Sequence, residues 1–166
     1  MGLDTVIVAG ILIIAAMAAS YVVVGGMNTV MRTTSETFKT MQEDNFDKMN
    51  TRIQIEDVVY INGSFYLRVS NAGSTKIRDV DKMDILVYDG KDTEWVPHIQ
   101  QKGEMGWVVE EIENDILNPG IFDPGEVMNI KVDLDYYIPY NSDTWIKIIA
   151  PNGAESTKYF SGGWYS

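Results

Sequence analysis

The sequence predicts an N-terminal transmembrane and stalk α-helix followed by an all-β immunoglobulin-like sandwich. Three observations support this fold class. The 22 residues from Thr5 to Gly26 carry no charge, residues 27–53 have helical spacing of apolar side chains, and the remaining sequence alternates apolar and polar residues in short runs. We therefore divide the chain into a membrane-spanning helix with an amphipathic stalk, residues 1–52, and an extracytoplasmic β-sandwich domain, residues 53–166.

The uncharged N-terminal run is long enough to cross a membrane. At 1.5 Å per residue, a helix of 22 residues spans about 33 Å, and a hydrocarbon core is about 30 Å thick. A signal peptide would have a basic flank and a cleavage site after the run, but the first basic residue is Arg32 and the Ala-x-Ala-like spot at 16–18 lies inside the run. We expect a permanent anchor rather than a signal peptide or a buried core helix. The residues expected to form this membrane or assembly helix are Val6, Val8, Ile11, Leu12, Ile13, Ile14, Met17, Tyr21 and Val22.

The segment after the apolar run has the pattern of an amphipathic stalk helix. It contains no proline, and Gly25 and Gly26 mark a candidate kink where it meets the membrane span. An apolar stripe on a rod in water needs a partner, either other copies of the chain or the protein's own β-domain, and the pattern does not choose between them. The stripe consists of Met27, Val30, Met31, Phe38, Met41, Phe46, Met49 and Ile53.

The β-domain begins where the helical spacing gives way to alternation. In residues 127–134 every second side chain is apolar, which is typical of a half-buried strand. Asn62-Gly63 and Asn152-Gly153 each lie between two such runs and predict tight hairpins. Seven or so short strands without a helical pattern among them favour an immunoglobulin-like sandwich. The other predicted strands are residues 53–61, 64–70, 84–90, 106–112, 145–150 and 156–160.

Composition argues against several classes of function. The chain has 166 residues, no cysteine, a single histidine (His98) and a formal net charge of −11, so disulfides and thiolate metal sites are excluded. Residues 53–166 hold 19 acidic and 9 basic residues, and a surface this acidic repels nucleic acid. A lone histidine and the lack of a nucleophile or phosphate-binding motif predict that the protein is not an enzyme and has no catalytic residues.

One acidic stretch offers oxygen ligands of the kind that Ca²⁺ prefers. Its spacing does not match an EF-hand loop, and the interleaved Arg78 and Lys82 favour ion pairing. We therefore expect no cofactor and no metal site, with a bound Ca²⁺ as the minor alternative. The carboxylates in question are Asp79, Asp81, Asp84, Asp89 and Asp92.

Two further features have both a structural and a functional interpretation. Asn62-Gly63-Ser64 is an N-glycosylation sequon, but the same Asn-Gly pair suits a hairpin turn. Tryptophan and tyrosine are abundant, and we expect most to pack in the core or on sheet faces, with an aromatic binding patch as the smaller alternative. The aromatic C-terminal residues 159–166 are expected to pack down. The four tryptophans are Trp95, Trp107, Trp145 and Trp164.

Five stretches, taken in order, match one family pattern. They are MGLDTVIVAGILIIAAM at the start, VSNAGSTKI (69–77), DILVYDG (84–90), FDPGEVMNIKVDL (122–134) and IIAPNGAES (148–156). In this order and spacing they resemble the archaeal flagellin-like proteins, most of all the archaellum accessory component F family. In that family an N-terminal membrane helix precedes an NTGST-like turn, a VDG strand end, a PGE turn and a closing NG hairpin. Here residues 71–75 carry the first turn with Ala72 in place of threonine, and Tyr88-Asp89-Gly90 carries the strand end.

The resemblance implies a structural role in the archaellum, the archaeal flagellum. Such proteins are stator elements, anchored in the membrane, whose β-sandwich reaches the S-layer and holds the rotating motor in place. The implied partners are the membrane, the S-layer protein, a sister component G and further copies of the chain. The implied location is the cell membrane, crossed once, with the β-domain outside the cytoplasm.

Archaellins and archaeal pilins share the same plan, so they supply the alternative. In that case the chain is a structural subunit of an archaellum or type IV pilus-like extracellular filament, assembled through its N-terminal helix. Such subunits are normally cut after a basic residue and a glycine ahead of the apolar run, whereas this chain has Met1-Gly2 there. This difference favours the uncleaved accessory protein.

Overall fold

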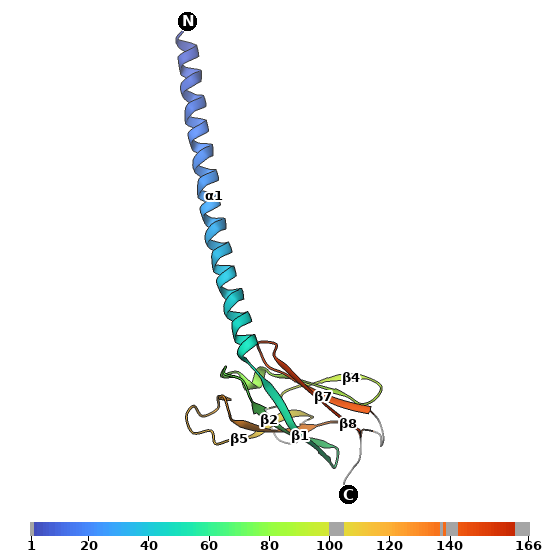
Figure 1. Cartoon of the computed structure of the whole chain (residues 1–166). Coiled ribbons are helices and arrows are strands. Elements are labelled where there is room, and N and C mark those ends of the chain that lie inside the picture. Colours follow the sequence, from blue (N-terminus) through green and yellow to red (C-terminus); the bar gives the residue numbers. More distant parts are fainter. Residues whose placement is uncertain (1, 100–104, 137, 139–142, 162–166) are drawn as a thin grey trace. The chain divides into compact units, whose positions relative to one another are not determined.

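The structure is a computed structural model that describes residues 2–99, 105–136, 138 and 143–161. The chain forms two compact units, a helical unit, Met1–Asp44, and a sandwich unit, Asn45–Ser166. Helix α1, Leu3–Asn50, begins in the first unit and ends in the second (Figure 1).

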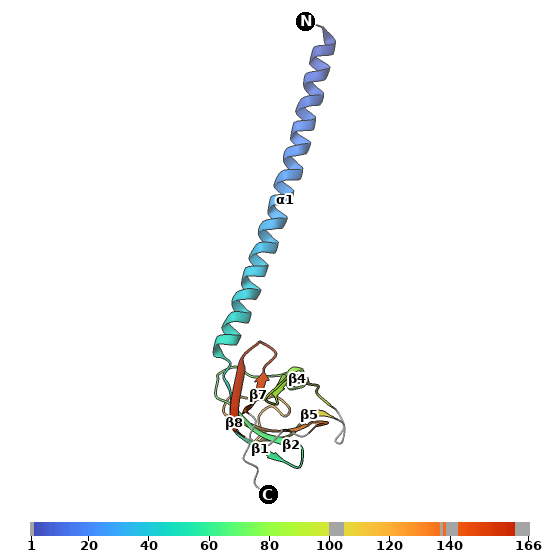
Figure 2. The ribbon, with the colours of Figure 1, turned by 90° about the vertical axis from the view of Figure 1, so that its right-hand side faces the viewer.

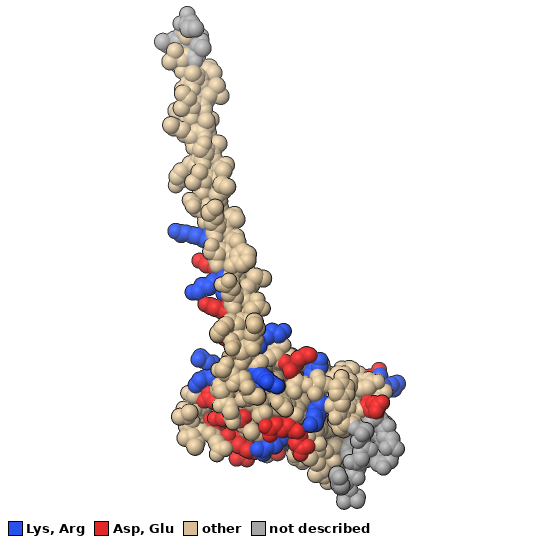
Figure 3. All heavy atoms as spheres, in the orientation of Figure 1, with Lys and Arg blue, Asp and Glu red and all other residues tan. Residues whose placement is uncertain are grey.

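Helix α1 is helical throughout, including Gly25 and Gly26, so the candidate kink does not interrupt its secondary structure. Every described side chain from Val6 to Met49 is exposed. Several of its hydroxyl groups donate to carbonyls four residues earlier in the helix, as where Ser20 Oγ donates to the carbonyl of Ala16 at 2.8 Å. In the view of Figure 3 the described part of the helix's N-terminal half shows no basic or acidic side chain, and basic and acidic side chains appear in its C-terminal half.

The sandwich unit consists of two four-stranded antiparallel sheets. One has the order β1-β2-β6-β5 and the other β4-β3-β7-β8, and the strands lie in two layers in Figures 1 and 2. With the strands lettered A, B, C, C′, D, E, F and G along the chain, these orders are ABED and C′CFG, which is the immunoglobulin arrangement. The strands are β1 Ile53–Ile61, β2 Ser64–Asn71, β3 Asp84–Tyr88, β4 Thr93–Val96, β5 Gly106–Glu113, β6 Val127–Asp133, β7 Asp143–Ile149 and β8 Glu155–Ser161, with a 3-10 turn, η1, at Val80–Lys82.

Alternation along the strands builds the core between the two sheets. In β6 the side chains of Met128, Ile130 and Val132 are buried, and Asn129 and Lys131 lie on the outer face, as the period of two requires. Aromatic rings fill the largest spaces. The most deeply buried large side chains include Trp107, Phe65, Phe122, Ile85, Ile146 and Ile148.

The two predicted hairpins are present, and their turns explain the Asn-Gly pairs. Asn62 and Gly63 join β1 to β2 with φ values of 52° and 88°, and Gly153 joins β7 to β8 with φ of 79°. A type I′ turn requires positive φ at both central residues, which asparagine and glycine adopt most easily, and the turn at Asn62 and Gly63 meets this requirement. In the β7–β8 turn only Gly153 has positive φ, so that turn is of another type.

The predicted fold class is confirmed, and the seven predicted strands are all present within a few residues of their predicted ends. The strand β4 was not predicted. Three of its four residues are exposed, so burial does not alternate along it. It is an edge strand that pairs only with β3, and Trp95 lies opposite Leu86 in this pairing. Tertiary pairing, rather than local pattern, places it in the sheet.

Candidate functional site: the junction at the end of the helix

The end of α1 enters the sandwich unit through a compact set of turns, which we call the junction: residues 47–52 with the turns 71–75, 122–126 and 150–154. The helix ends in a hydroxyl cap. Thr51 is buried, and its Oγ1 donates to the carbonyl of Asp47 at 2.7 Å while accepting from Asn152 Nδ2 at 2.7 Å. Asn152 therefore ties the β7–β8 turn directly to the end of the helix.

Backbone amides of the turn 71–75 donate hydrogen bonds to carbonyls at the end of the helix. A helix leaves its final carbonyls without intrahelical partners. The amide of Ser74 donates to the carbonyl of Asn50 at 2.8 Å, and the amide of Ala72 donates to that of Arg52 at 2.7 Å. The approach is so close that a Cβ on Gly73 would lie 2.4 Å from the nitrogen of Arg52 and 2.5 Å from the oxygen of Asn50. Only glycine fits this position without movement of the backbone.

Asn71 joins two of these segments, the turns 71–75 and 122–126. Its side chain is fully buried; Nδ2 donates to the carbonyls of Thr75 at 2.9 Å and Phe122 at 3.0 Å, and Oδ1 accepts from the amide of Gly73 at 3.1 Å. Its backbone carbonyl accepts from Gly125 at 2.8 Å. Because a buried amide is costly unless it is satisfied, this network fixes the turns 71–75 and 122–126 to one another.

The Asp-Pro-Gly-Glu turn adds charge to the junction. Asp123 is buried, accepts a hydrogen bond from Asn118 and pairs with Lys76, whose Nζ lies 3.1 Å from Oδ1. Hydrogen bonding from Asn118, together with Lys76, holds the pKa of Asp123 below its usual value. The amide of Asp123 donates to Glu126 Oε2 at 2.8 Å, which closes the turn.

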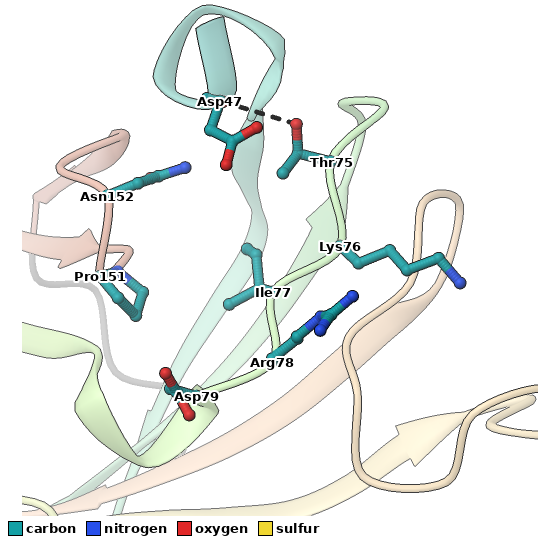
Figure 4. Close-up of a pocket in the computed structure, with 8 residues that line it drawn as sticks. All are labelled: Asp47, Thr75, Lys76, Ile77, Arg78, Asp79, Pro151 and Asn152. Atoms are coloured by element: carbon teal, nitrogen blue, oxygen red, sulfur yellow. Dashed lines mark hydrogen bonds between the residues drawn. The ribbon is translucent and has the colours of Figure 1, made fainter. Parts of the chain in front are cut away.

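A hollow of about 390 Å³ lies beside the end of the helix. Figure 4 shows Asn152 pointing toward Asp47, Ile77 at the floor, and Lys76 extending away from the hollow. A long hydrogen bond of 3.5 Å joins Thr75 Oγ1 to the carbonyl of Asp47. The wall of the hollow is shared between the helix end and two turns.

The nine predicted helix residues all project from α1, with exposed fractions between 55% and 83%. Helix α1 meets the length and composition needed to span a membrane over Val6–Asn50, with mean hydropathy 2.6 in its most apolar window. Phe46 and Met49 lie within the sandwich unit, yet both are exposed, so these two stripe residues do not pack on the sheets. Ile53, predicted as the last residue of the stripe, is instead the first residue of β1 and is buried in the core, because the helix ends at Asn50. Whether copies of the chain cover the stripe stays a prediction, as does glycosylation of the exposed Asn62.

The structure does not bring the acidic stretch together as a ligand set. Among the residues that the structure describes, no three His, Cys, Asp or Glu side chains lie close enough to share a metal ion. Asp79 pairs with Lys82 at 3.2 Å, and Asp84 accepts from the indole of Trp95 at 2.8 Å. Hydrogen bonds from the amides of Asp92 and Lys91 lower the pKa of Asp89.

The histidine and the tryptophans have separate environments. His98 packs edge-on against Trp107, with 4.5 Å between ring centroids, and Trp107 is fully buried. Trp95 is 56% exposed, and Trp145 lies on the outer face of its sheet. Trp164, with the rest of the C-terminal residues 162–166, lies outside the described residues.

The junction was not predicted as a site, although its turns are visible in the sequence as family motifs. What the sequence does not reveal is that these motifs meet. Their meeting depends on β2 pairing with β6, which places Ser70 opposite Val127 and so brings residue 71 beside the turn 122–126.

Comparison with known proteins identifies the family. A family model described as archaeal-type flagellin matches residues 4–160. The chain belongs to the archaeal-type flagellin family. The predicted membership in the flagellin-like superfamily is thereby confirmed. An uncharacterized protein of Archaeoglobus fulgidus is 28% identical over 169 residues, covering 97% of each chain.

Solved structures share the fold at low sequence identity. The archaellum periplasmic stator protein FlaG from Sulfolobus acidocaldarius has a TM-score of 0.56 at 20% identity, over 66% of this chain and 99% of that chain. The complex of FlaF and FlaG from the same organism gives 0.55 at 19% identity, over 66% and 89%. The archaeal flagellum of Methanospirillum hungatei strain JF1 gives 0.58 at 15% identity, over 99% and 96%. The family member thus shares its fold with both stator proteins and a filament.

Proposed function

We propose that this protein is a non-enzymatic archaellum component, a membrane-anchored stator or adaptor that links the motor to the S-layer. The observation that carries the proposal is the uncharged half of α1. From Val6 to Gly26 every side chain is exposed, and the sandwich unit buries a separate core of its own. The helix therefore needs an apolar surrounding that the sandwich does not need.

Lipid is the surrounding that fits this helix best. The run is apolar on all sides, which is typical of a membrane span rather than of a helix lying on a protein surface. Ser20 within the run and Thr29 after it donate to carbonyls four residues earlier, so these two hydroxyls do not add unsatisfied donors. We place the protein in the cell membrane, crossed once, with the acidic β-domain outside.

The junction supports a load-bearing role. A stator must resist force, and the helix end is held by hydrogen bonds from two separate turns, 71–75 and 150–154. Thr51, Ser74 and Asn152 take part directly in these bonds. The fold shared with archaellum periplasmic stator proteins, one of them solved as a complex of FlaF and FlaG, makes a sister stator component a proposed partner. The S-layer is a proposed partner because the sequence resembles the archaellum accessory component F family.

A filament subunit is the second candidate, and one observation favours it. The fold likeness to the Methanospirillum hungatei flagellum covers 99% of this chain, helix included. In that role α1 would pack among copies of itself instead of in lipid. The net charge of −10 on residues 53–166 counts against dense packing, because neighbouring domains of like charge repel one another.

The chain has no cysteine, so single cysteines report on each position without background. Intact cells carrying Ile13→Cys or Lys91→Cys would be treated with a membrane-impermeant maleimide. We expect Lys91→Cys to be labelled at once and Ile13→Cys only after detergent, without disulfide-linked dimers on oxidation. Disulfide-linked dimers of Ile13→Cys in sheared filaments would establish the filament subunit and overturn the membrane anchor.

A further inference from the structure

A row of aromatic side chains crosses the outer face of the β4-β3-β7-β8 sheet. The register places Tyr88 opposite Trp145 and Trp145 opposite Tyr159. Because Val87 and Ile146 point into the core, their neighbours Tyr88 and Trp145 point outward. Trp95 also points outward and lies opposite Leu86, in the next row of outward side chains. We call these four residues the aromatic face: Tyr88, Trp95, Trp145 and Tyr159.

The rings of the aromatic face are ordered and accessible. Tyr88 and Trp145 are stacked, with centroids 5.6 Å apart and planes inclined by 17°. Tyr159 is 75% exposed, and it borders a hollow of about 620 Å³ that Trp145 and Asp143 also line. Single exposed apolar side chains are common on protein surfaces, but contiguous groups of them mark interaction sites, and aromatic residues are enriched in interfaces. The grouping of these rings therefore indicates a binding site.

The charge on this sheet face is acidic. Its outward positions carry the carboxylates Asp84, Asp143 and Glu155 and one ammonium group, Lys147. Lys147 is already paired with Glu155 at 3.1 Å, and Asp84 accepts from Trp95 Nε1. Among the described residues, Asp143 makes no hydrogen bond or ion pair with its carboxylate, although it lines the same hollow as Trp145 and Tyr159.

We propose that the aromatic face binds a cationic side chain, lysine or arginine, presented by a basic segment of a partner protein. The negative faces of Trp145 and Tyr159 attract a cation, and Asp143 supplies the opposing charge beside them. The acidic domain steers such a partner toward the hollow. The site lies wholly within the sandwich unit, so it does not depend on whether α1 lies in lipid or in a filament.

A neutral glycan is the competing occupant, because sugars also stack on aromatic rings. The unpaired carboxylate and the acidic surroundings favour the cation. The two occupants differ in a measurable way: cation binding weakens as salt rises and needs Asp143, whereas sugar stacking is insensitive to salt.

The test uses the full chain in detergent, titrated by calorimetry with an arginine-containing hexapeptide, a glycine-serine hexapeptide and a neutral chito-oligosaccharide. We expect binding of the arginine peptide alone, weaker at high salt. Tyr159→Ser should weaken it about two- to fivefold, and Tyr159→Phe should preserve it. The matched control is Tyr66→Ser, which removes an exposed ring from the outer face of the other sheet and should leave affinity unchanged.

The charge variants complete the test. Asp143→Asn should weaken arginine-peptide binding about two- to fivefold, and Glu111→Gln, an equal charge change on the other sheet, should not. No binding of the arginine peptide, or equal loss in Tyr159→Ser and Tyr66→Ser, would overturn the proposal. Oligosaccharide binding that depends on Tyr159 but not on Asp143 would replace it with a glycan site.

Discussion

The helical unit and the sandwich unit use apolar residues in opposite ways. In the sandwich unit they alternate with polar residues, and one face of each strand is buried, as for Ile146 and Ile148 in β7. In the helical unit they are continuous, and Leu12, Ile13 and Ile14 are all more than half exposed. The sandwich therefore contains its own driving force for folding, whereas the helix must find an apolar environment outside the chain.

The largest expected difference comes from removing one phenylalanine in each unit. Phe65 is fully buried between Tyr60 and Phe160, with ring centroids 4.6 Å and 5.3 Å away. Phe65→Ala should lower the free energy of unfolding by about 3–5 kcal/mol. Phe38 is 63% exposed on α1, so Phe38→Ala should change it by less than about 0.5 kcal/mol. Urea unfolding of the full chain in detergent measures both; equal losses would contradict the division.

A charge introduced into the apolar run of α1 should impair membrane insertion, whereas the same charge on the surface of the sandwich unit should not. Ile13→Lys places an ammonium group near the middle of the span and should cost about 2.5–3.5 kcal/mol of membrane insertion. Ile116→Lys puts the same charge at a site of the sandwich unit that is 79% exposed, and it should not affect insertion. The readout is the fraction of protein that resists carbonate extraction. The account fails if the two variants are extracted alike.

Replacing a glycine by alanine should destabilise the sandwich unit at one position and stabilise the helix at another. A Cβ on Gly73 would meet backbone atoms of Arg52 and Asn50 at 2.4 Å and 2.5 Å, so Gly73→Ala should destabilise the sandwich unit by about 1–3 kcal/mol. Nothing lies within 4 Å of a Cβ on Gly25, and Gly25→Ala should leave the sandwich unchanged while favouring helix by up to about 1 kcal/mol. Thermal unfolding followed by tryptophan fluorescence separates the two; a stable Gly73→Ala would show that the junction is not tightly packed.

Acid should loosen the junction of the sandwich unit, as the smallest of these effects. The pKa of Asp123 is lowered in the folded state, so its contribution is present above the ordinary carboxyl pKa of about 3.9 and is lost as pH falls through the depressed value. Stability should therefore fall below about pH 4. Asp123→Asn removes this titration, and its urea midpoint should fall less between pH 5 and lower pH than that of the unmodified protein. A parallel fall in both proteins would exclude Asp123 as a contributor.

The parts of this molecule that follow from local pattern were predictable. Residues 127–134 revealed a strand by alternation, and Asn62-Gly63 revealed a hairpin by its need for positive φ. The junction could not be derived in the same way. Asn71 looks like an ordinary turn residue, and its role depends on the carbonyl of Phe122, 51 positions away.

The aromatic face shows the same limit. Trp145 and Tyr159 lie on the two strands of the predicted Asn152-Gly153 hairpin, but Tyr88 is far away in sequence, and only the pairing of β3 with β7 aligns it with them. Alternation does predict that each of them points away from the core. It does not predict which strands are neighbours, because strand pairing is a long-range property of the sandwich.

The most direct test of the central claim is where the native protein is found after cells are sheared. Mechanical shearing releases extracellular filaments, and the stripped cells can then be lysed and their membranes collected. If α1 is a lipid anchor, most of the protein should remain in the membrane fraction and leave it only with detergent. Recovery of most of the protein in the sheared filaments would contradict the account and identify it as a filament subunit.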